Sequence, residues 1–425
     1  MKQEQLLGPF SQIVTLQDLP PNGPLPDSGL KIVEGGGVLT EGDLISEVLN
    51  RSAFEKYRNR FPSDNLLPVG ETSVLIPGLV DSHTHICYGG SRADDYARRL
   101  RGETYLEIAR KGGGILSTVT ETRKASAERL TETLCRRAYA HLTRGVTTCE
   151  VKSGYGLDFD TELKMLRVIN QVAKKDNLPD LIPTCLSAHV KPEEFDSRSG
   201  YLDYVAERIL PAVKREALSR RVDIFVEKGA FGVDMSIVFV KKAKAMGFDI
   251  TVHANQFSGG GSHVAAETGA VSADHLEASE AKDWELLQGA GTVATVLPGA
   301  SMGLGLPFAP ARKMLDAGLS LAIASDWNPG SAPMGDLLMQ AAVLGAAERL
   351  TLCETLAAIT VRAAKTLGLN DRGLIKPGYA ADMIAFPCSS YKDIFYHQGS
   401  LKPHLIWKRG RLIGNRKKSL NSTGE

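Results

Sequence analysis

The sequence predicts an α/β protein: a (β/α)8 barrel with a small β domain built from both ends of the chain. Eight short and mostly apolar runs recur through residues 75–330, as expected for parallel strands buried on both faces. Amphipathic segments with helical periodicity separate the runs, and the whole span has the usual barrel size of about 250 residues. Shorter strand-like pieces at both ends do not continue this alternation.

The eight apolar runs are the predicted barrel strands. Segments such as 161–175, 236–247 and 311–318 have helical patterns, and the helices expected at 333–347 and 351–367 would close the barrel. A doubly wound sheet is the competing fold, but no GxGxxG turn follows the first strand. The predicted strands are 75–82, 146–153, 180–189, 222–229, 248–255, 269–276, 291–299 and 319–326.

The two ends of the chain consist of strand-like pieces, including LKIVEG, ADMIAFP and HLIWKRGRLIG, separated by turn residues. We expect them to pair into one domain formed by 1–74 and 371–425, leaving 75–370 for the barrel. Two independent tails are the alternative, although their apolar content argues against disorder.

Composition excludes several classes of function. The 425 residues carry 50 Lys and Arg against 49 Asp and Glu, a net charge of +1, which does not fit a general nucleic-acid or membrane-surface binder. No apolar stretch reaches membrane-helix length, and the first residues do not resemble a signal peptide. Six cysteines without a CxxC pair argue against a zinc ribbon or disulfide framework, so we expect a cytoplasmic protein.

Barrel chemistry lies at the carboxyl ends of the strands, and five of the nine histidines fall there. His83 and His85 are two residues apart in an extended segment, so both can face one ion. His253 and Asp326 complete an N3O ligand set suited to one Zn²⁺ or Fe²⁺/Fe³⁺. The polar residues at the strand ends are His83, His85, Lys152, His189, Glu227, His253, His275 and Asp326.

The motifs PGLVDSHTH, HAN, ADHLE and ASDWNPG make the chain resemble the amidohydrolase superfamily. Within it, the sequence is most similar to the imidazolonepropionase family. This resemblance extends from about Leu75 to the end of the chain and rests on GGSRADDYARR (89–99), YLEIARKGGGI (105–115), EVKSGYGL (150–157), LSAHV (186–190), VSADHLE (271–277) and SDWNPGSAP (325–333).

The resemblance implies a distorted barrel with a β-sandwich and a hydrolase that opens the ring of 4-imidazolone-5-propanoate to give N-formimidoyl-L-glutamate. A metal-activated water would attack the ring carbonyl, with His275 and Asp326 assisting proton transfer. We expect a homodimer on base rates for soluble enzymes. The implied substrate-binding residues are Arg92, Tyr155, His189, Gln256, Asn328, Gly330 and Ser331.

Several questions stay open from sequence. Alternation on strand 4 would turn Glu227 or Lys228 inward; an inward Glu227 predicts one metal, and an inward lysine that becomes carboxylated predicts two. Lys152 fits an ion pair in the barrel mouth as well as a catalytic role. Gln256 stands where related deaminases carry a proton-shuttling glutamate; an amide cannot carry that proton, which argues against deamination. A hydantoinase-like hydrolase and a scaffold without catalysis are the remaining alternatives.

Overall fold

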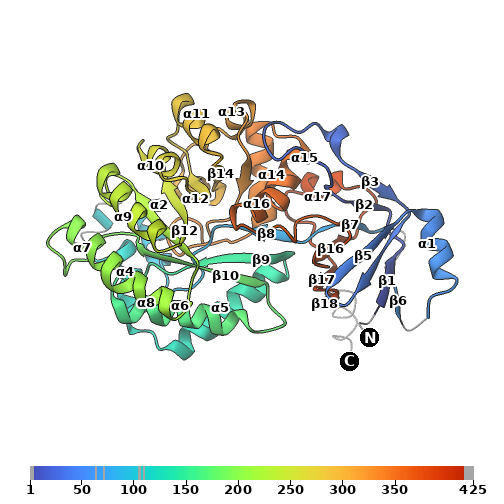
Figure 1. The fold of residues 1–425 in the computed structure, drawn as a ribbon, viewed down its shortest axis with the longest axis horizontal. Helices are drawn as coiled ribbons and strands as arrows, with labels where there is room; N and C mark the ends of the chain where they lie inside the picture. Colours follow the sequence, from blue (N-terminus) through green and yellow to red (C-terminus); the bar gives the residue numbers. More distant parts are fainter. Residues whose placement is uncertain (1–3, 63–64, 70–71, 104–106, 109–110, 416–425) are drawn as a thin grey trace.

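The computed structural model describes residues 4–62, 65–69, 72–103, 107–108 and 111–415. At its centre, eight strands form one parallel sheet in chain order, which confirms the predicted barrel (Figure 1). Every predicted strand overlaps an observed one. The barrel strands are β8 (Leu79–Asp81), β9 (Val146–Lys152), β10 (Asp180–Ala188), β11 (Arg221–Val226), β12 (Asp249–Ala254), β13 (Ser272–His275), β14 (Val293–Val296) and β15 (Leu321–Ile323).

The barrel closes between its two edge strands, β8 and β15, only near their carboxyl ends. There Asp326 N–H donates to His83 O (3.0 Å) and His85 N–H donates to Trp327 O (2.9 Å). Nearer the start of β8, Val80 N–H donates instead to Ile359 O (2.9 Å), from the segment that joins α15 to α16. The barrel is distorted here, because this segment takes the place of a direct β8–β15 hydrogen bond. The hydrogen bonds near the carboxyl ends bring the segments that follow β8 and β15 together.

Helices follow most strands and surround the barrel (Figure 1). The segment between β8 and β9 contains helices of its own, at the place where the sequence has its longest gap between barrel strands. The helices after β8 are α2 (Ala93–Leu100), α4 (Ile115–Lys124), α5 (Ala127–Leu142), α6 (Phe159–Ala173), α7 (Arg198–Tyr204), α8 (Leu210–Arg215), α9 (Val233–Ala245), α10 (Gly261–Thr268), α11 (Ala281–Ala290), α12 (Pro298–Leu304), α13 (Ala311–Asp316), α14 (Leu337–Glu348), α15 (Leu352–Ala358), α16 (Val361–Thr366) and α17 (Lys392–Tyr396).

The first predicted barrel strand, 75–82, is divided in the structure. Its first half is β7 (Val74–Pro77), which belongs to a terminal sheet, and only its second half is β8. Gly78 allows the crossing because a Cβ there would lie 2.2 Å from Thr147 Oγ1. The prediction of a single barrel strand over 75–82 was therefore wrong for its first half. An apolar sequence shows that a strand is buried, but it does not show which sheet the strand joins.

Strands from both ends of the chain form two further sheets, so the tails are not independent of each other. In the six-stranded sheet, β7 pairs antiparallel with β16, which places Ile76 opposite Ile384 (Figure 1). Phe10 and Trp407 meet edge to face in the core of this region. The strands are β1 (Glu4–Gly8), β2 (Gln12–Val14), β3 (Ile32–Glu34), β4 (Gly37–Glu41), β5 (Leu44–Leu49), β6 (Leu66–Pro68), β16 (Met383–Phe386), β17 (Leu405–Lys408) and β18 (Arg411–Asn415), with helix α1 (Arg51–Arg58) beside them.

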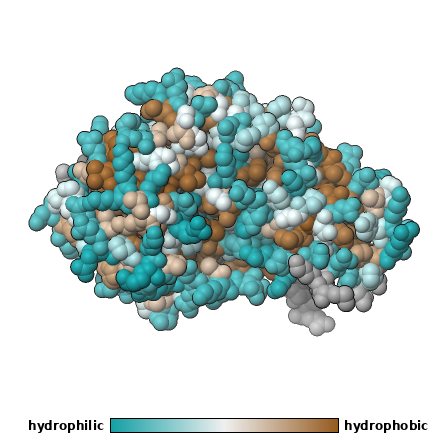
Figure 2. All heavy atoms as spheres, in the orientation of Figure 1, coloured by the Kyte–Doolittle hydropathy of each residue, from teal (hydrophilic) through white to brown (hydrophobic). Residues whose placement is uncertain are grey.

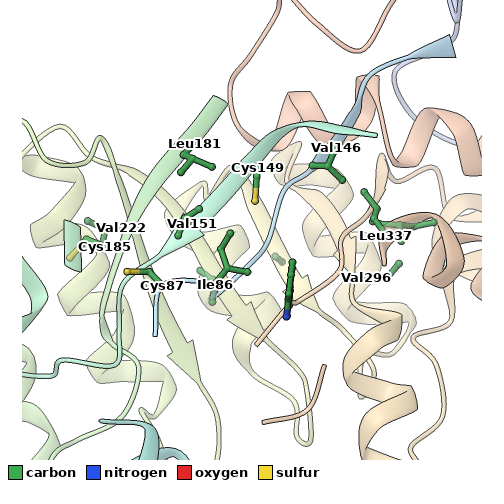
Figure 3. Close-up of a cluster of buried hydrophobic side chains, with 14 of the residues drawn as sticks. Ile86, Cys87, Val146, Cys149, Val151, Leu181, Cys185, Val222, Val296 and Leu337 are labelled. Carbon is green, nitrogen blue, oxygen red and sulfur yellow. The ribbon is translucent and has the colours of Figure 1, made fainter. Parts of the chain in front are cut away.

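The buried core beside β9 contains cysteines among aliphatic side chains (Figure 3). All six cysteines of the chain are free thiols, as their spacing predicted. Burial raises the pKa of Cys87 and of Cys185 to about 12, and raises the pKa of Cys149 well above its usual value. These three thiols stay protonated at neutral pH, so they act as small apolar residues in the core.

On the face shown in Figure 2, hydrophilic residues follow most of the outline, and hydrophobic residues lie in several groups between them. Among the described residues, no helix is both long enough and apolar enough to cross a membrane.

A buried ion cluster joins the start of β10 to the terminal strands. Asp180 accepts hydrogen bonds from Arg372 Nη1 (2.6 Å) and lies 3.0 Å from Lys408 Nζ. Burial disfavours the charge of Asp180, but Lys408 and Arg372 outweigh it and lower its pKa to about 2 from 3.8. The folded protein therefore holds this carboxylate ionised at pH values where an unfolded chain would take up a proton.

Replacing Asp180 by Asn is expected to lower the free energy of unfolding by about 2 kcal/mol at pH 7. Because the folded pKa is depressed, this stabilisation is present above pH 4 and is lost as the pH falls from about 4 to 2. Denaturant titrations of both proteins should converge over that range. The more exposed Asp43→Asn, whose carboxylate lies 3.9 Å from Arg409, is the control and should change little. A constant difference at every pH would contradict the assignment.

Candidate active site

The carboxyl ends of the barrel strands deliver a group of buried histidines to one place. His83 and His85 follow β8, His253 lies on β12, and their Nε2 atoms converge: His85 Nε2 lies 3.2 Å from His83 Nε2 and 3.3 Å from His253 Nε2. Asp326, brought in by the barrel closure, places Oδ1 at 3.4 Å from His85 Nε2 and 3.6 Å from His83 Nε2. The structure thus brings together the four residues predicted as metal ligands.

Two carboxylates fix the orientation of these imidazoles from behind. His83 Nδ1 donates to Asp274 Oδ2 (2.7 Å), and His253 Nδ1 lies 2.9 Å from Asp223 Oδ2. Since an ionised carboxylate only accepts hydrogen bonds, the proton of the His83 ring sits on Nδ1 and the lone pair of its Nε2 faces the site. The contact with Asp223 leaves Nε2 of His253 directed toward the same place. Burial, reinforced by Lys152, lowers the pKa of His83 well below its usual value, so its ring is neutral.

This donor set fits a divalent metal ion. Tetrahedral zinc with bonds of about 2.0–2.1 Å has ligand atoms about 3.3–3.4 Å apart. The spacings of His85 Nε2 from His83 Nε2 and from His253 Nε2 match that edge length, and the three residues form a group able to hold a metal. Phe225 on β11 faces the histidines, with its ring 5.7 Å from that of His253, whereas Lys228, two residues after the end of β11, is exposed. A bridging lysine therefore has no inward position at Lys228.

Glu227, the residue directly after β11, forms hydrogen bonds with the turn after β12. Its carboxylate accepts hydrogen bonds from Phe257 N–H (2.9 Å) and Ser258 N–H (3.1 Å), as well as from the Ser258 hydroxyl. Glu227 is buried and ties down the turn after β12. Gln256, half-buried, begins that turn directly after Asn255, whose φ of +52° is in the left-handed region. Glu227 thus shapes the segment that carries Gln256.

His275 ends β13 beside the metal-ligand group, with its ring 5.3 Å from that of His253. Its Nδ1 lies 3.5 Å from Glu277 Oε2, and Ser301 Oγ donates to the other oxygen of Glu277 (3.3 Å). Burial opposes protonation of His275, but Glu277 outweighs it and raises the pKa of the imidazole. The φ of His275 is +88°, a strained value of the kind found at functional sites.

Tyr155, in the turn after β9, and His189, directly after β10, lie beside His85. The His189 ring stacks on that of His85 at 5.5 Å, and the Tyr155 ring is 5.9 Å from His85 and 5.5 Å from His189. His189 Nδ1 donates to Gly154 O (3.0 Å), which leaves Nε2 as the free ring nitrogen. Glu162 fixes the turn between them by accepting from the N–H groups of Gly154 and Gly156. Tyr155 and His189, two of the residues predicted to bind the substrate, therefore lie next to the group of metal-ligand histidines.

Arg92 is held at the start of α2 by a short hydrogen bond from its Nε to Asp95. Asp95 also accepts from Gly114 N–H (2.9 Å), so it joins Arg92 to the GGGI turn. The guanidinium lies beside Gly330, where a Cβ would come within 3.3 Å of Nη1. Among the described residues, none accepts a hydrogen bond from either Nη group, the pair of donors with which a guanidinium grips a carboxylate.

The loop after Asp326 is organised by Asn328. Its Oδ1 accepts from the N–H groups of Gly330 (2.7 Å) and Ser331 (2.8 Å), and its Nδ2 donates to Asp326 O (2.7 Å). Nδ2 also donates to Ser331 Oγ at 2.9 Å. Both polar atoms of the Asn328 side chain thus bond within the loop, whose Gly330 lies beside Arg92. Substrate contacts by these three residues stay a prediction.

Sequence reasoning missed the residues that support the ligands. Asp223 and Asp274 interrupt the apolar runs VDIFV and VSADH, and a charge inside a buried strand was the available signal. Strand pairing brings them to the histidines: β11 lies beside β12, where Asp223 contacts His253, and Asp274 on β13 reaches His83. Glu277 lies in the quoted motif VSADHLE but was not assigned a role.

Comparison with known proteins identifies the family. A model of the amidohydrolase family matches residues 74–413. The chain belongs to the amidohydrolase family. With the three-histidine group, family membership indicates a site for a divalent metal ion and a hydrolytic reaction.

Curated relatives within this family are imidazolonepropionases. That of Bacillus cytotoxicus is 42% identical over 354 residues, covering 81% of this chain and 82% of the relative. That of Bacillus cereus is 39% identical over 395 residues, covering 91% of both chains.

Solved structures of the amidohydrolase fold are similar at low identity. A triazine hydrolase variant has a TM-score of 0.72 at 15% identity, covering 97% of this chain and 95% of that one. A zinc-bound adenosine deaminase from Xanthomonas campestris has a TM-score of 0.69 at 17% identity, covering 97% and 93%. These likenesses confirm the barrel with its additional sheets as the fold.

Proposed function

We propose that this protein is an imidazolonepropionase, which hydrolyses 4-imidazolone-5-propanoate to N-formimidoyl-L-glutamate. The observation that carries the proposal is the identity of about 40% over most of the chain to relatives of that name. The site supports it with residues suited to a flat, polar ring bearing a carboxylate: neutral His189, Tyr155 and Arg92 around the metal-ligand group.

The chain's own residues divide the work of ring opening. A metal ion at His83, His85, His253 and Asp326 would supply Lewis acidity, lowering the pKa of a water and polarising the ring carbonyl. Asp326 accepts the proton that the water loses as it adds to the carbonyl carbon. His275 donates a hydrogen bond to the oxyanion that develops there.

The C–N bond then breaks, and Asp326 returns the proton to the departing ring nitrogen, so atoms and charge balance. Tyr155 and His189 would keep the ring in place, with Gln256 as a hydrogen-bonding partner that carries no proton. The Arg92 guanidinium would bind the propionate through its two Nη groups.

The direct experiment is incubation of the purified protein with freshly prepared 4-imidazolone-5-propanoate. Loss of the ring absorbance with formation of N-formimidoyl-glutamate supports the proposal. Release of ammonia instead would identify a deaminase and overturn it. Loss of absorbance at the buffer rate would overturn it as well.

We propose one Zn²⁺ or iron ion per subunit, since the exposed Lys228 leaves strand β11 without a bridging ligand. Elemental analysis of the purified protein should find about one equivalent per chain. Two equivalents together with a carboxylated lysine would contradict the single-metal site. The proposed assembly is a homodimer, which sedimentation would test, and the proposed location is the cytoplasm.

Replacing Arg92 by Ala is expected to raise KM by about 10- to 100-fold, because hydrogen bonds to charged groups contribute about 1.5–3 kcal/mol. The metal content and the kcat should change much less, since Arg92 does not touch the ligand group. Steady-state kinetics with the propionate substrate measure the effect. Arg136→Ala, on the exposed side of α5, is the control. An unchanged KM would remove Arg92 from the substrate site.

A further inference from the structure

A lysine is completely buried in the interior of the barrel, just beneath the histidines. Lys152 ends β9 and its Nζ lies 2.9 Å from Glu150 Oε1, 2.7 Å from Asp223 Oδ2 and 4.0 Å from Asp274 Oδ2. Barrel interiors are usually filled by branched apolar side chains, and a buried ion pair carries a desolvation cost of several kcal/mol per ion. A hydrophobic core would thus serve stability at least as well, so the cluster needs another reason.

The carboxylates around Lys152 are those that hold the metal-ligand histidines. Asp223 Oδ2 is the atom next to both Lys152 Nζ and His253 Nδ1, and Asp223 Oδ1 also accepts from His253 N–H (3.2 Å). Asp274 Oδ2 accepts from His83 Nδ1 (2.7 Å) and from Thr251 Oγ1 (3.0 Å), and faces Lys152 on its remaining side. One ammonium therefore connects two of the three histidines through their supporting carboxylates.

The positive charge of Lys152 balances the carboxylates that surround it. Burial disfavours its charged form, but Asp223 and Glu150 outweigh burial and raise the pKa of Lys152 above its usual value. The nearest other cation of the cluster, Arg221, lies 4.0 Å from Glu150 rather than at either aspartate. Without the ammonium, the two aspartates and Glu150 would repel one another in a medium that screens charge weakly.

We propose that Lys152 is a positioning residue of the metal centre. Its ammonium holds the carboxylates of Asp223 and Asp274 against Nδ1 of His253 and His83, and so fixes the direction of the two Nε2 lone pairs. The inference rests on the proposed use of a metal at this site, but not on the identity of the substrate. In this role Lys152 acts through its ion pairs and does not touch the substrate.

The test is metal binding by the full-length Lys152→Met protein, measured without substrate. Competition with a chromophoric chelator should show a Zn²⁺ dissociation constant at least about tenfold higher than that of the original protein, since residues that orient ligands contribute about 10- to 100-fold to affinity. The visible spectrum of bound Co²⁺ should also change, because two ligand imidazoles are no longer held. An original protein that binds no Zn²⁺ would overturn the metal proposal itself.

A second buried lysine supplies the matched control. Lys408 lies 2.7 Å from Asp382 and 3.0 Å from Asp180, far along the chain from the histidines. Lys408→Met should lower stability and leave the Zn²⁺ affinity and Co²⁺ spectrum unchanged. If it weakens Zn²⁺ binding as much as Lys152→Met does, the effect is general destabilisation and the proposal is overturned.

A charge-matched double variant separates positioning from simple neutralisation. Glu150→Gln combined with Lys152→Met removes one carboxylate and one ammonium, so the net formal charge of the cluster is unchanged. The same measurements are made on this variant, which leaves no unpaired Glu150 carboxylate in the core. We expect the double variant to remain at least about tenfold weaker in Zn²⁺ affinity. Full recovery of affinity and Co²⁺ spectrum would show that Lys152 merely balances Glu150, and would overturn the proposal.

Discussion

Replacing Asp326 by Asn is expected to lower kcat by about 10³-fold or more, since positioned proton transfer contributes about 10²- to 10⁴-fold and this residue also joins the metal-ligand group. Asp326 is buried, and its Oδ1 lies within 3.6 Å of the Nε2 atoms of His83 and His85. Burial raises the pKa of Asp326, although His275 and His253 act against the rise. A more basic carboxylate is the better acceptor for the proton of the attacking water.

Asparagine is the informative substitution because of the backbone. Asp326 has a φ of +49°, which Asn adopts more readily than Ala. Asp326→Asn therefore removes the charge while keeping the strained turn, whereas Asp326→Ala would add backbone strain to the chemical change. Because Asn has nearly the same size and shape as Asp, Asp326→Asn leaves no cavity.

The loss of ring absorbance measures kcat, and elemental analysis reports how much metal is retained. Asp196→Asn, an exposed aspartate, is the control for the same chemical change. If Asp326→Asn keeps activity within tenfold of the original protein, Asp326 is not the proton acceptor. The proton would then have to leave through another group.

The barrel strands were predictable because strands that are buried on both faces have nearly continuous apolar sequences. The runs 146–153 and 180–189 match β9 and β10 to within one residue at each end. The limit of this signal is visible at Gly78, where one apolar run supplies strands to two sheets. Pairing partners come from distant segments, such as β16 for β7, and hydrophobicity does not encode them.

The ligand histidines were predictable for a related reason. They end strands, and strand ends of a parallel barrel share one rim, so sequence position alone brings His83, His85 and His253 together. The residues behind them depend on register between strands. Nothing in the spacing of Lys152 and Asp223 shows that their side chains meet at 2.7 Å, because one is on β9 and the other on β11.

The loops were the least predictable part of the site. Asn328 is a polar residue in a loop beside the site, which is typical of a substrate contact. Its amide group, however, forms hydrogen bonds within its own loop. Glu227 stands at a strand end, yet it anchors the turn after the next strand. In both cases a polar side chain bonds to backbone N–H groups of a loop, and the sequence does not distinguish this role from contact with a ligand.

Replacing His275 by Asn is expected to lower kcat by about 10²- to 10⁴-fold with little change in metal content. His275 is not part of the three-histidine group, and its Nδ1 faces Glu277 rather than the ligands. The imidazole would be the side-chain donor to the developing oxyanion, and its loss removes that hydrogen bond. Asn tolerates the φ of +88° at this position better than most other non-glycine residues that lack an imidazole.

Glu277→Gln separates the imidazole from its support. Because Glu277 raises the pKa of His275, the substitution should lower that pKa, and activity that requires protonated His275 should decline at a lower pH than in the original protein. The pH profile of kcat measures this shift, and the effect on kcat at the optimum should be smaller than that of His275→Asn. Equal profiles for Glu277→Gln and the original protein would mean that Glu277 does not set the charge of His275. Full activity of His275→Asn would remove the histidine from the reaction altogether, leaving oxyanion stabilisation to the metal ion alone.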